Sequence, residues 1–284
     1  MMASLYALLA ALVYGAADFL GGIATRRATM IGAVLTTQGA GLLFLLAVTP
    51  LLPDATVSRH DLAFGVLAGL TGSSGVALLY LALAIGPMSV VAPVTAVCAA
   101  IVPLAIGLAL GERPHPVAAA GVVLALGAVA LLSQSETPAS SNPVRVTLGK
   151  GVRVALASGV AIGFFFACLA QTRAEAVLWP LVVSRSVSVA IFFTMASIGG
   201  RPAGVPRAAL APALACGALD MVANALYLAA ARQGQLGLVA TLSSLYPAST
   251  VLLARVVLGE RLGMWQQVGV AGAVAAVVLI VSHS

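Results

Sequence analysis

Ten long apolar segments alternate with short polar connections along the chain. A helix needs about 20 mainly apolar residues to cross a bilayer, and each segment is close to that length. The runs are continuous and show no alternation of apolar and polar positions, which excludes a membrane β-barrel. The pattern therefore predicts an all-α integral membrane protein with ten transmembrane helices. These helices are expected at Ala3–Ala24, Met30–Leu52, Leu62–Ile85, Met88–Leu110, Val117–Ser133, Val152–Ala170, Leu178–Ile198, Ala208–Ala231, Leu236–Leu258 and Met264–Ser282.

The longest polar stretch, residues 134–150, divides the ten spans into two groups of five. A shift of 148 residues places the Gly-Glu-Arg triplet at 111–113 on the triplet at 259–261, with 14 identities in the 42 positions around them. We interpret residues 1–133 and 151–284 as homologous five-helix repeats joined by a linker. Because five is odd, the second repeat is expected to be inverted in the membrane. The triplet glutamates are expected to pair with the adjacent arginines at the membrane interface.

Composition supports lipid as the main solvent of the protein surface. Of the 284 residues, 61% are hydrophobic and 8% are charged, whereas soluble domains carry about 25% charged residues. The net charge of +6 comes from dispersed basic residues, so nucleic acid is not expected as a partner. The three cysteines lie in apolar segments at spacings that fit no metal motif. We therefore predict neither a bound metal nor a cofactor.

Three ionisable residues lie well inside the predicted spans, namely Asp18, Arg185 and Asp220. Charges within a bilayer are costly, so each is a candidate for function. Asp220 could be a titratable carboxylate in a cavity or could pair with Arg185, which lies at a similar depth. Asp18 could bind a proton or a cationic group, or it could form a structural hydrogen bond near a helix end. Arg185 stays charged, so it would neutralise an acid or bind a substrate carboxylate.

A polar stripe on the eighth span accompanies Asp220. Asn224 and Tyr227 follow it at helical spacing, and Tyr14 lies one turn before Asp18 on the first span. We predict that these side chains line a cavity, and the alternative is an interhelical polar clamp. The further candidates are Tyr80, Ser243 and Ser244 as lining residues, and Pro93 and Pro247 as interruptions of the fourth and ninth helices.

Four motifs carry a resemblance to a known family over essentially the whole chain. They are residues 14–22 (YGAADFLGG), 86–94 (GPMSVVAPV) and 243–247 (SSLYP), and the paired Gly-Glu-Arg triplets. On these motifs the chain resembles a ten-helix EamA-type member of the drug/metabolite transporter superfamily. The resemblance implies two inverted repeats and a transporter of amino acids, other metabolites or toxic compounds, often an exporter driven by a proton gradient. Many relatives have Trp-Gly where this chain has Tyr14-Gly15.

Two criteria give opposite orientations in the membrane. The connections after the odd-numbered spans carry nine basic residues, against four on the other side. The positive-inside rule then places both termini outside, whereas the family resemblance implies that both lie inside.

The sequence favours a secondary transporter that exports small organic metabolites or drugs by alternating access coupled to protons, in a bacterial inner membrane. An uptake or exchange carrier of the same fold is the first alternative. A membrane-embedded enzyme is disfavoured because no catalytic cluster or phosphate-binding loop is present in the sequence. A channel is disfavoured because it would not explain inverted halves. The expected partners are a small-molecule substrate, protons and the lipid bilayer.

Overall fold

Helices make up nearly all of the chain that the computed structural model describes, which comprises residues 2–25, 27–85, 88–132, 148–199, 204–258 and 263–283. The α-helices are α1 (Met2–Thr25), α2 (Met30–Val48), α3 (Arg59–Ile85), α4 (Met88–Ala109), α5 (Pro116–Leu132), α6 (Leu148–Ala170), α7 (Trp179–Ile198), α8 (Arg207–Ala231), α9 (Leu236–Ser243), α10 (Tyr246–Leu258) and α11 (Met264–Val281). Two short 3₁₀ helices, η1 (Thr49–Leu51) and η2 (Ala174–Ala176), lie in connections.

The predicted ten transmembrane helices are confirmed, with one refinement. Eight helical segments of the described chain are long and apolar enough to cross a bilayer, and apolar helices within α4 and α5 complete the ten. The refinement concerns the ninth segment, because α9 and α10 together make a single crossing.

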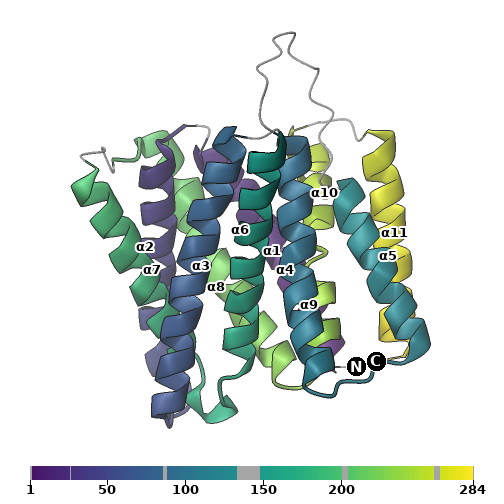
Figure 1. Ribbon diagram of the computed structural model, residues 1–284. Coiled ribbons are helices and arrows are strands. Elements are labelled where there is room, and N and C mark those ends of the chain that lie inside the picture. Colours follow the sequence, from purple (N-terminus) through teal and green to yellow (C-terminus); the bar gives the residue numbers. More distant parts are fainter. Residues whose placement is uncertain are drawn as a thin grey trace.

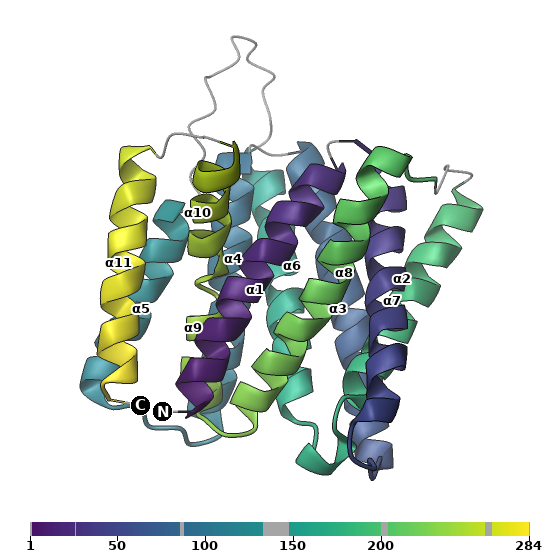
Figure 2. The ribbon, with the colours of Figure 1, turned by 180° about the vertical axis from the view of Figure 1, so that it is seen from behind.

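Successive crossings run in opposite directions, and both termini lie at the same end of the molecule, called here the lower end (Figures 1 and 2). α1 begins at the lower end, whereas α6 begins at the opposite, upper end. The first five crossings, α1 to α5, and the second five, α6 to α11, therefore traverse the membrane in opposite senses. This arrangement confirms the inverted five-helix repeats that the sequence predicts.

Helix packing shows the two-fold symmetry expected of such repeats. α1 packs on α8, and its counterpart α6 packs on α3. α2 packs on α8, and its counterpart α7 packs on α3. α4 contacts α6 just as α10 contacts α1, and α5 packs on its own counterpart α11. All of these contacts join one half to the other, so the two halves fold as one interleaved unit.

Glycines 148 residues apart permit equivalent helices to approach closely. A Cβ atom on Gly69 of α3 would lie 2.6 Å from the Cβ of Val187 in α7. A Cβ on its counterpart Gly217 of α8 would collide with the backbone of α2. The same relation holds for Gly15 against α10 and Gly163 against α4. Small residues at these positions bring helix backbones together in a membrane, where no hydrophobic effect drives helices into contact.

The two prolines predicted to interrupt helices behave differently. α4 runs from end to end without a break, so the interruption expected at Pro93 was wrong. Pro93 is the sixth residue of α4, and a proline so close to a helix start removes one backbone hydrogen bond. The ninth segment does break after Ser243, and Pro247 follows as the second residue of α10. Proline has no N–H to donate to the carbonyl of Ser243, so the helix cannot continue through this point with regular hydrogen bonds.

Candidate functional site

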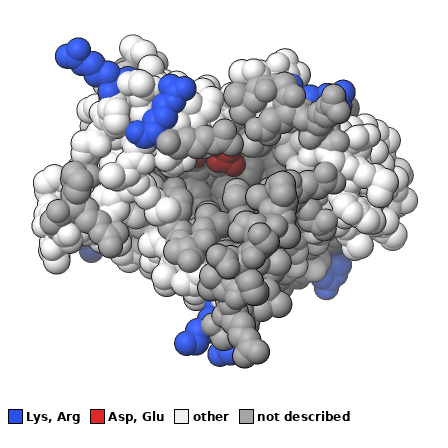
Figure 3. All heavy atoms as spheres, turned by 90° about the horizontal axis from the view of Figure 1, so that it is seen from above, with Lys and Arg blue, Asp and Glu red and all other residues white. Residues whose placement is uncertain are grey.

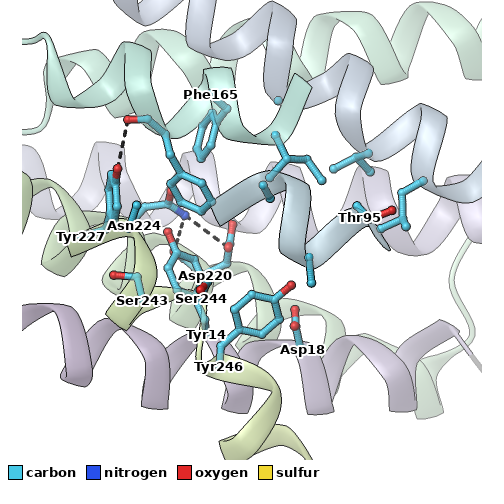
Figure 4. A pocket seen from close by; sticks show the side chains of 18 of the residues that line it. Tyr14, Asp18, Thr95, Phe165, Asp220, Asn224, Tyr227, Ser243, Ser244 and Tyr246 are labelled. Carbon is cyan, nitrogen blue, oxygen red and sulfur yellow. Dashed lines mark hydrogen bonds between the residues drawn. The ribbon is translucent and has the colours of Figure 1, made fainter. Parts of the chain in front are cut away.

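The candidate site is a cavity of about 310 Å³ between the two halves of the protein. Figure 3 shows a hollow in the middle of the upper face, with acidic side-chain atoms visible inside it. Helices α1 to α4 and α6 to α10 supply the lining, part of which is shown in Figure 4. The lining residues are Tyr14, Asp18, Gln38, Gly72, Val76, Leu79, Thr95, Ala96, Ala99, Ile162, Phe165, Phe166, Ser184, Arg185, Ser188, Asp220, Asn224, Tyr227, Ala240, Ser243, Ser244 and Tyr246.

A charged cluster joins three helices in this cavity. An Nη2 atom of Arg185 on α7 lies 2.5 Å from Oδ2 of Asp220 on α8. The other terminal nitrogen of Arg185 donates to Oε1 of Gln38 on α2. Asn224, one turn after Asp220, donates from Nδ2 to the Asp220 backbone carbonyl at 2.7 Å and to its carboxylate at 3.2 Å. Arg185 and Asp220 therefore neutralise each other, and neither is available alone to a solute.

Asp18 is the acid of the cavity without such a partner. No ion pair or hydrogen bond joins the side chain of Asp18 to any residue in the described part of the chain. Its side chain is exposed to the open cavity rather than packed among lipid-facing helices. The titratable groups that face it are Tyr14 on its own helix, Cys216 and Asp220 on α8, and Tyr246 on α10. With Asp220 neutralised, ionised Asp18 leaves the cavity with a net charge of −1.

Two buried polar atoms in the cavity lack a partner among the described groups. They are the hydroxyl of Tyr14, whose residue is 8% exposed, and Oδ1 of Asn224, whose residue is 2% exposed. Buried polar atoms are normally hydrogen-bonded, because leaving one unpaired costs about 1–3 kcal/mol. Both residues line the cavity, so a bound solute or water can supply the missing hydrogen bonds.

Aromatic rings border the polar groups. Tyr14 meets Phe166 edge to face with 6.1 Å between ring centroids, and Tyr246 lies 6.2 Å from Tyr14. Phe166 also lies 4.7 Å from Tyr227 and 5.1 Å from Phe165. The Tyr227 hydroxyl donates to the backbone carbonyl of Phe166 at 3.2 Å, which ties α8 to α6 below the cavity. The cavity therefore offers a solute both aromatic surface and a few polar groups.

A carboxylate joins the α4–α5 connection to the start of α9 at the lower end. Glu112, in the connection between α4 and α5, accepts hydrogen bonds from the backbone N–H groups of Leu236 and Gly237, the latter at 3.0 Å. These are the first two residues of α9, and the positive end of a helix dipole favours an anion there. The ion pair expected between Glu112 and Arg113 was wrong, because among the described residues Arg113 donates instead to the Glu112 backbone carbonyl, at 3.3 Å, and the pair expected at residues 260 and 261 lies outside the described residues. The two backbone donors at the helix terminus are already held in place by α9, whereas pairing with Arg113 would require ordering a long, exposed side chain.

Two arginines join other connections at the same end. Arg232, at the end of α8, donates to the carbonyl of Val177 at 3.1 Å and to the hydroxyl of Thr172 at 3.3 Å. Burial lowers the pKa of Arg232, although a guanidinium remains charged at neutral pH. Arg173 donates to one oxygen of Asp61, Oδ2, from Nη2 at 2.9 Å and from Nε at 3.1 Å, and this hydrogen bonding raises the pKa of Arg173. These contacts join the connections at the lower end, whereas the cavity is hollowed toward the upper face (Figure 3).

The structure places most of the predicted site residues around one cavity. Those that line it are Tyr14, Asp18, Arg185, Asp220, Asn224, Tyr227, Ser243 and Ser244. Of the two serines, Ser244 donates its hydroxyl to a backbone carbonyl at 2.8 Å, and Ser243 makes a longer contact at 3.5 Å. The side chains of Tyr80 and Pro93 lie outside what the structure describes. No cluster of three or more potential metal ligands occurs in the described ranges.

Sequence reasoning missed several contributors, of which Gln38 and Phe166 make the most specific contacts. Gln38 is an amide within the second span, and this isolated polar residue in an apolar run was a usable signal. Phe166 lies in a run of three phenylalanines on α6, and nothing in the run indicates which ring faces the cavity and which faces lipid.

Comparison with known proteins decides the class. The sequence profile of the EamA-like transporter family matches residues 1–134 and, separately, residues 149–282. The chain belongs to the EamA-like transporter family. It is therefore a multi-pass membrane transporter of the drug/metabolite type. One solved structure, described simply as the crystal structure of a protein, is 18% identical to this EamA-type chain and matches its fold with a TM-score of 0.76 over 98% of each chain. No curated protein matches the sequence.

Proposed function

We propose that this EamA-type protein is a secondary transporter that exports small organic metabolites or drugs by alternating access, driven by protons. The observation that carries the proposal is the cavity between the inverted halves, which is hollowed toward the upper face, while hydrogen bonds join the connections at the lower end. In inverted-repeat transporters, exchange of conformation between the repeats opens the opposite side. The units that would exchange are residues 1–133 and 151–284, with 134–150 as the linker.

Asp18 is the proposed site of proton coupling. A coupling group must exchange protons with water and must respond to the substrate, and Asp18 faces the open cavity that the substrate would occupy. Asp220 is less suited, because its carboxylate is already bonded to Arg185. A proton on Asp18 would remove the unpaired charge of the empty site. The protein could then change conformation without a bare carboxylate inside the membrane.

The direction of transport is tested together with the driving force. Cells that produce the protein are loaded with a panel of fluorescent or radiolabelled metabolites and drugs, and efflux is followed with and without a proton uncoupler. We expect faster efflux of at least one compound than in cells with the Asp18→Asn variant, and loss of this difference with the uncoupler. Accumulation of a compound instead of its efflux would favour uptake. An efflux rate that does not change with the uncoupler would favour exchange. Asp54→Asn, at an exposed loop position, is the matched control.

The side to which the cavity opens follows from the position of the termini. They lie at the lower end, opposite the cavity mouth (Figures 1 and 3). A reporter fused to the C-terminus that is active only outside the cytoplasm would show that the cavity opens to the cytoplasm. Activity only inside would show that it opens outward. The proposed cell-membrane location is checked in the same cells by fractionation.

A further inference from the structure

At several equivalent positions that line the cavity, one repeat has a polar side chain where the other has an apolar residue or glycine. Positions 148 residues apart are equivalent in the repeats, and both members of several such pairs line the cavity. On α3 and α8, Gly72 corresponds to Asp220 and Val76 corresponds to Asn224. In each pair the member on α3 is apolar or lacks a side chain, and the member on α8 is polar. The symmetric scaffold therefore encloses a site that is chemically asymmetric.

The first helices of the repeats show the same contrast. Asp18 on α1 corresponds to Phe166 on α6, and Tyr14 corresponds to Ile162. Because α1 packs on α8 and α3 packs on α6, the polar members gather on one side and the apolar members on the other. We name these sides the polar wall, formed by Tyr14, Asp18, Asp220 and Asn224, and the apolar wall, formed by Val76, Leu79, Ile162 and Phe166.

We infer that the substrate is an amphipathic organic monocation, a protonated amine whose ammonium group is held by Asp18 and whose hydrocarbon part lies on the apolar wall. This inference rests on the proposed function and narrows it to one substrate class. The charges of the lining residues indicate the sign of the charge on the substrate. Asp18 and Asp220 supply two negative charges, Arg185 supplies one positive charge, and Arg185 is already bonded to Asp220 and Gln38. A substrate carboxylate would find no unpaired cation among the described lining residues.

The unpaired polar atoms are acceptors for N–H groups. The carboxylate of Asp18 and Oδ1 of Asn224 can only accept, and the hydroxyl of Tyr14 can accept as well as donate. An ammonium group offers donors to these atoms. The rings of Tyr14 and Phe166 add surface that attracts a cation and packs against hydrocarbon. A bare metal ion fits less well, because it needs several oxygen ligands at short distance and gains nothing from the apolar wall.

The geometry gives the bound amine a direction. α1 rises from the lower end, so Asp18 lies one turn nearer the mouth than Tyr14. α6 descends from the upper end, so Phe166 lies one turn deeper than Ile162. The ammonium group therefore lies toward the mouth, and the hydrocarbon part points down toward Phe166. A proton and the ammonium group compete for the Asp18 carboxylate. Binding of one would therefore accompany release of the other, which couples their movement in opposite directions across the membrane.

The test measures binding to the purified full-length protein by titration calorimetry at mildly alkaline pH. The probes share one phenyl-alkyl body, namely phenethylammonium, phenethyltrimethylammonium, phenethyl alcohol and hydrocinnamate, and hexylammonium adds an alkyl body. We expect phenethylammonium to bind at least about tenfold more tightly than phenethyl alcohol, and hydrocinnamate not to bind. Asp18→Asn should abolish the preference for the ammonium, and Asp54→Asn should keep it.

Equal affinity for the ammonium and the alcohol, preference for hydrocinnamate, or no binding of any of the three cations would overturn the inference. The comparison of probes on the wild-type protein stands even if Asp18→Asn does not fold. Proton-driven transport of another solute, with no ammonium binding, would overturn the substrate class and leave the proposed function intact.

Discussion

Asp220 and Arg185 form an ion pair between α8 and α7, with 2.5 Å between Oδ2 and Nη2, while Asp18 in the same cavity has no ion partner among the described residues. The ion pair gives the two acids of the cavity different surroundings. The carboxylate of Asp220 is already bonded to the guanidinium of Arg185. Asp18 remains free to exchange a proton or to meet a cation. The ion pair therefore joins α7 to α8 beside the site, and Asp18 is the acid that we propose for proton coupling.

Removing one member of the pair should destabilise the protein. Asp220→Asn leaves the guanidinium of Arg185, whose side chain is 12% exposed, without its carboxylate. Because the Asp220 side chain is itself 31% exposed and water can screen the charge, we expect a loss of about 2 kcal/mol in the free energy of unfolding. Thermal unfolding of the purified protein in detergent measures this loss.

Adding Arg185→Gln should restore part of the free energy of unfolding that Asp220→Asn removes. Arg185→Gln combined with Asp220→Asn removes the uncompensated charge, so the double variant should be more stable than the sum of the two single losses. Asp54→Asn, which removes an exposed loop carboxylate, serves as the control and should unfold like the wild type. Strict additivity of the two single effects would show that the residues are not coupled.

Close helix approach at Gly217 should tolerate no side chain. A Cβ at this position of α8 would collide with the backbone of α2, and Gly41 faces it from that helix. Gly217→Ala should therefore cost about 1–3 kcal/mol by forcing the helices apart. Gly127 of α5 has nothing within 4 Å of an added Cβ, so Gly127→Ala should leave the melting temperature unchanged or slightly raise it. Equal melting temperatures for the two variants would contradict this account of the packing.

Glu112 should hold the lower end closed. Glu112→Gln keeps the size of the side chain but removes the charge that faces the start of α9, so the lower end should open more often. The accessibility of Val76→Cys, in a background without the native cysteines, reports opening because Val76 lines the cavity. We expect the rate of labelling by a membrane-impermeant thiol reagent from the lower side to rise about fivefold.

The same reagent supplies the control for that experiment. Without the Glu112 substitution, the cysteine should react from the upper side and react slowly from the lower side. Fast labelling from the lower side in both proteins would mean that Glu112 is not part of the seal. Asp54→Asn, at an exposed position of the connection between α2 and α3, should leave the labelling rate unchanged.

Much of the fold was predictable because lipid imposes a simple rule. A helix that crosses a bilayer must be long and apolar, so hydropathy alone located α8 at Ala208–Ala231 against an observed Arg207–Ala231. The odd number of spans in each half then required inversion. The division of the ninth span at Ser243 was less accessible, because Pro247 marks a break whereas Pro93 does not. The sequence records each proline but not whether the neighbouring helices can accommodate it.

The candidate site was partly predictable. Ionisable residues within spans are rare, so Asp18, Arg185 and Asp220 could be identified without a structure. The contact of Arg185 with Gln38 depends on the packing of α7 against α2, which no local pattern records. The asymmetry between Asp18 and Phe166 is visible only once both are known to line one cavity.

Protons are proposed to drive transport through Asp18. The direct measurement uses purified protein in sealed vesicles, with an imposed pH gradient and a substrate identified in the efflux panel, and compares the wild type with Asp18→Asn at matched protein content. We predict that the gradient drives accumulation against the substrate gradient in wild-type vesicles. In Asp18→Asn vesicles, the pH gradient should drive no accumulation although the protein is folded by its elution profile and melting temperature. Gradient-driven transport at the wild-type rate in the Asp18→Asn vesicles would contradict the claim.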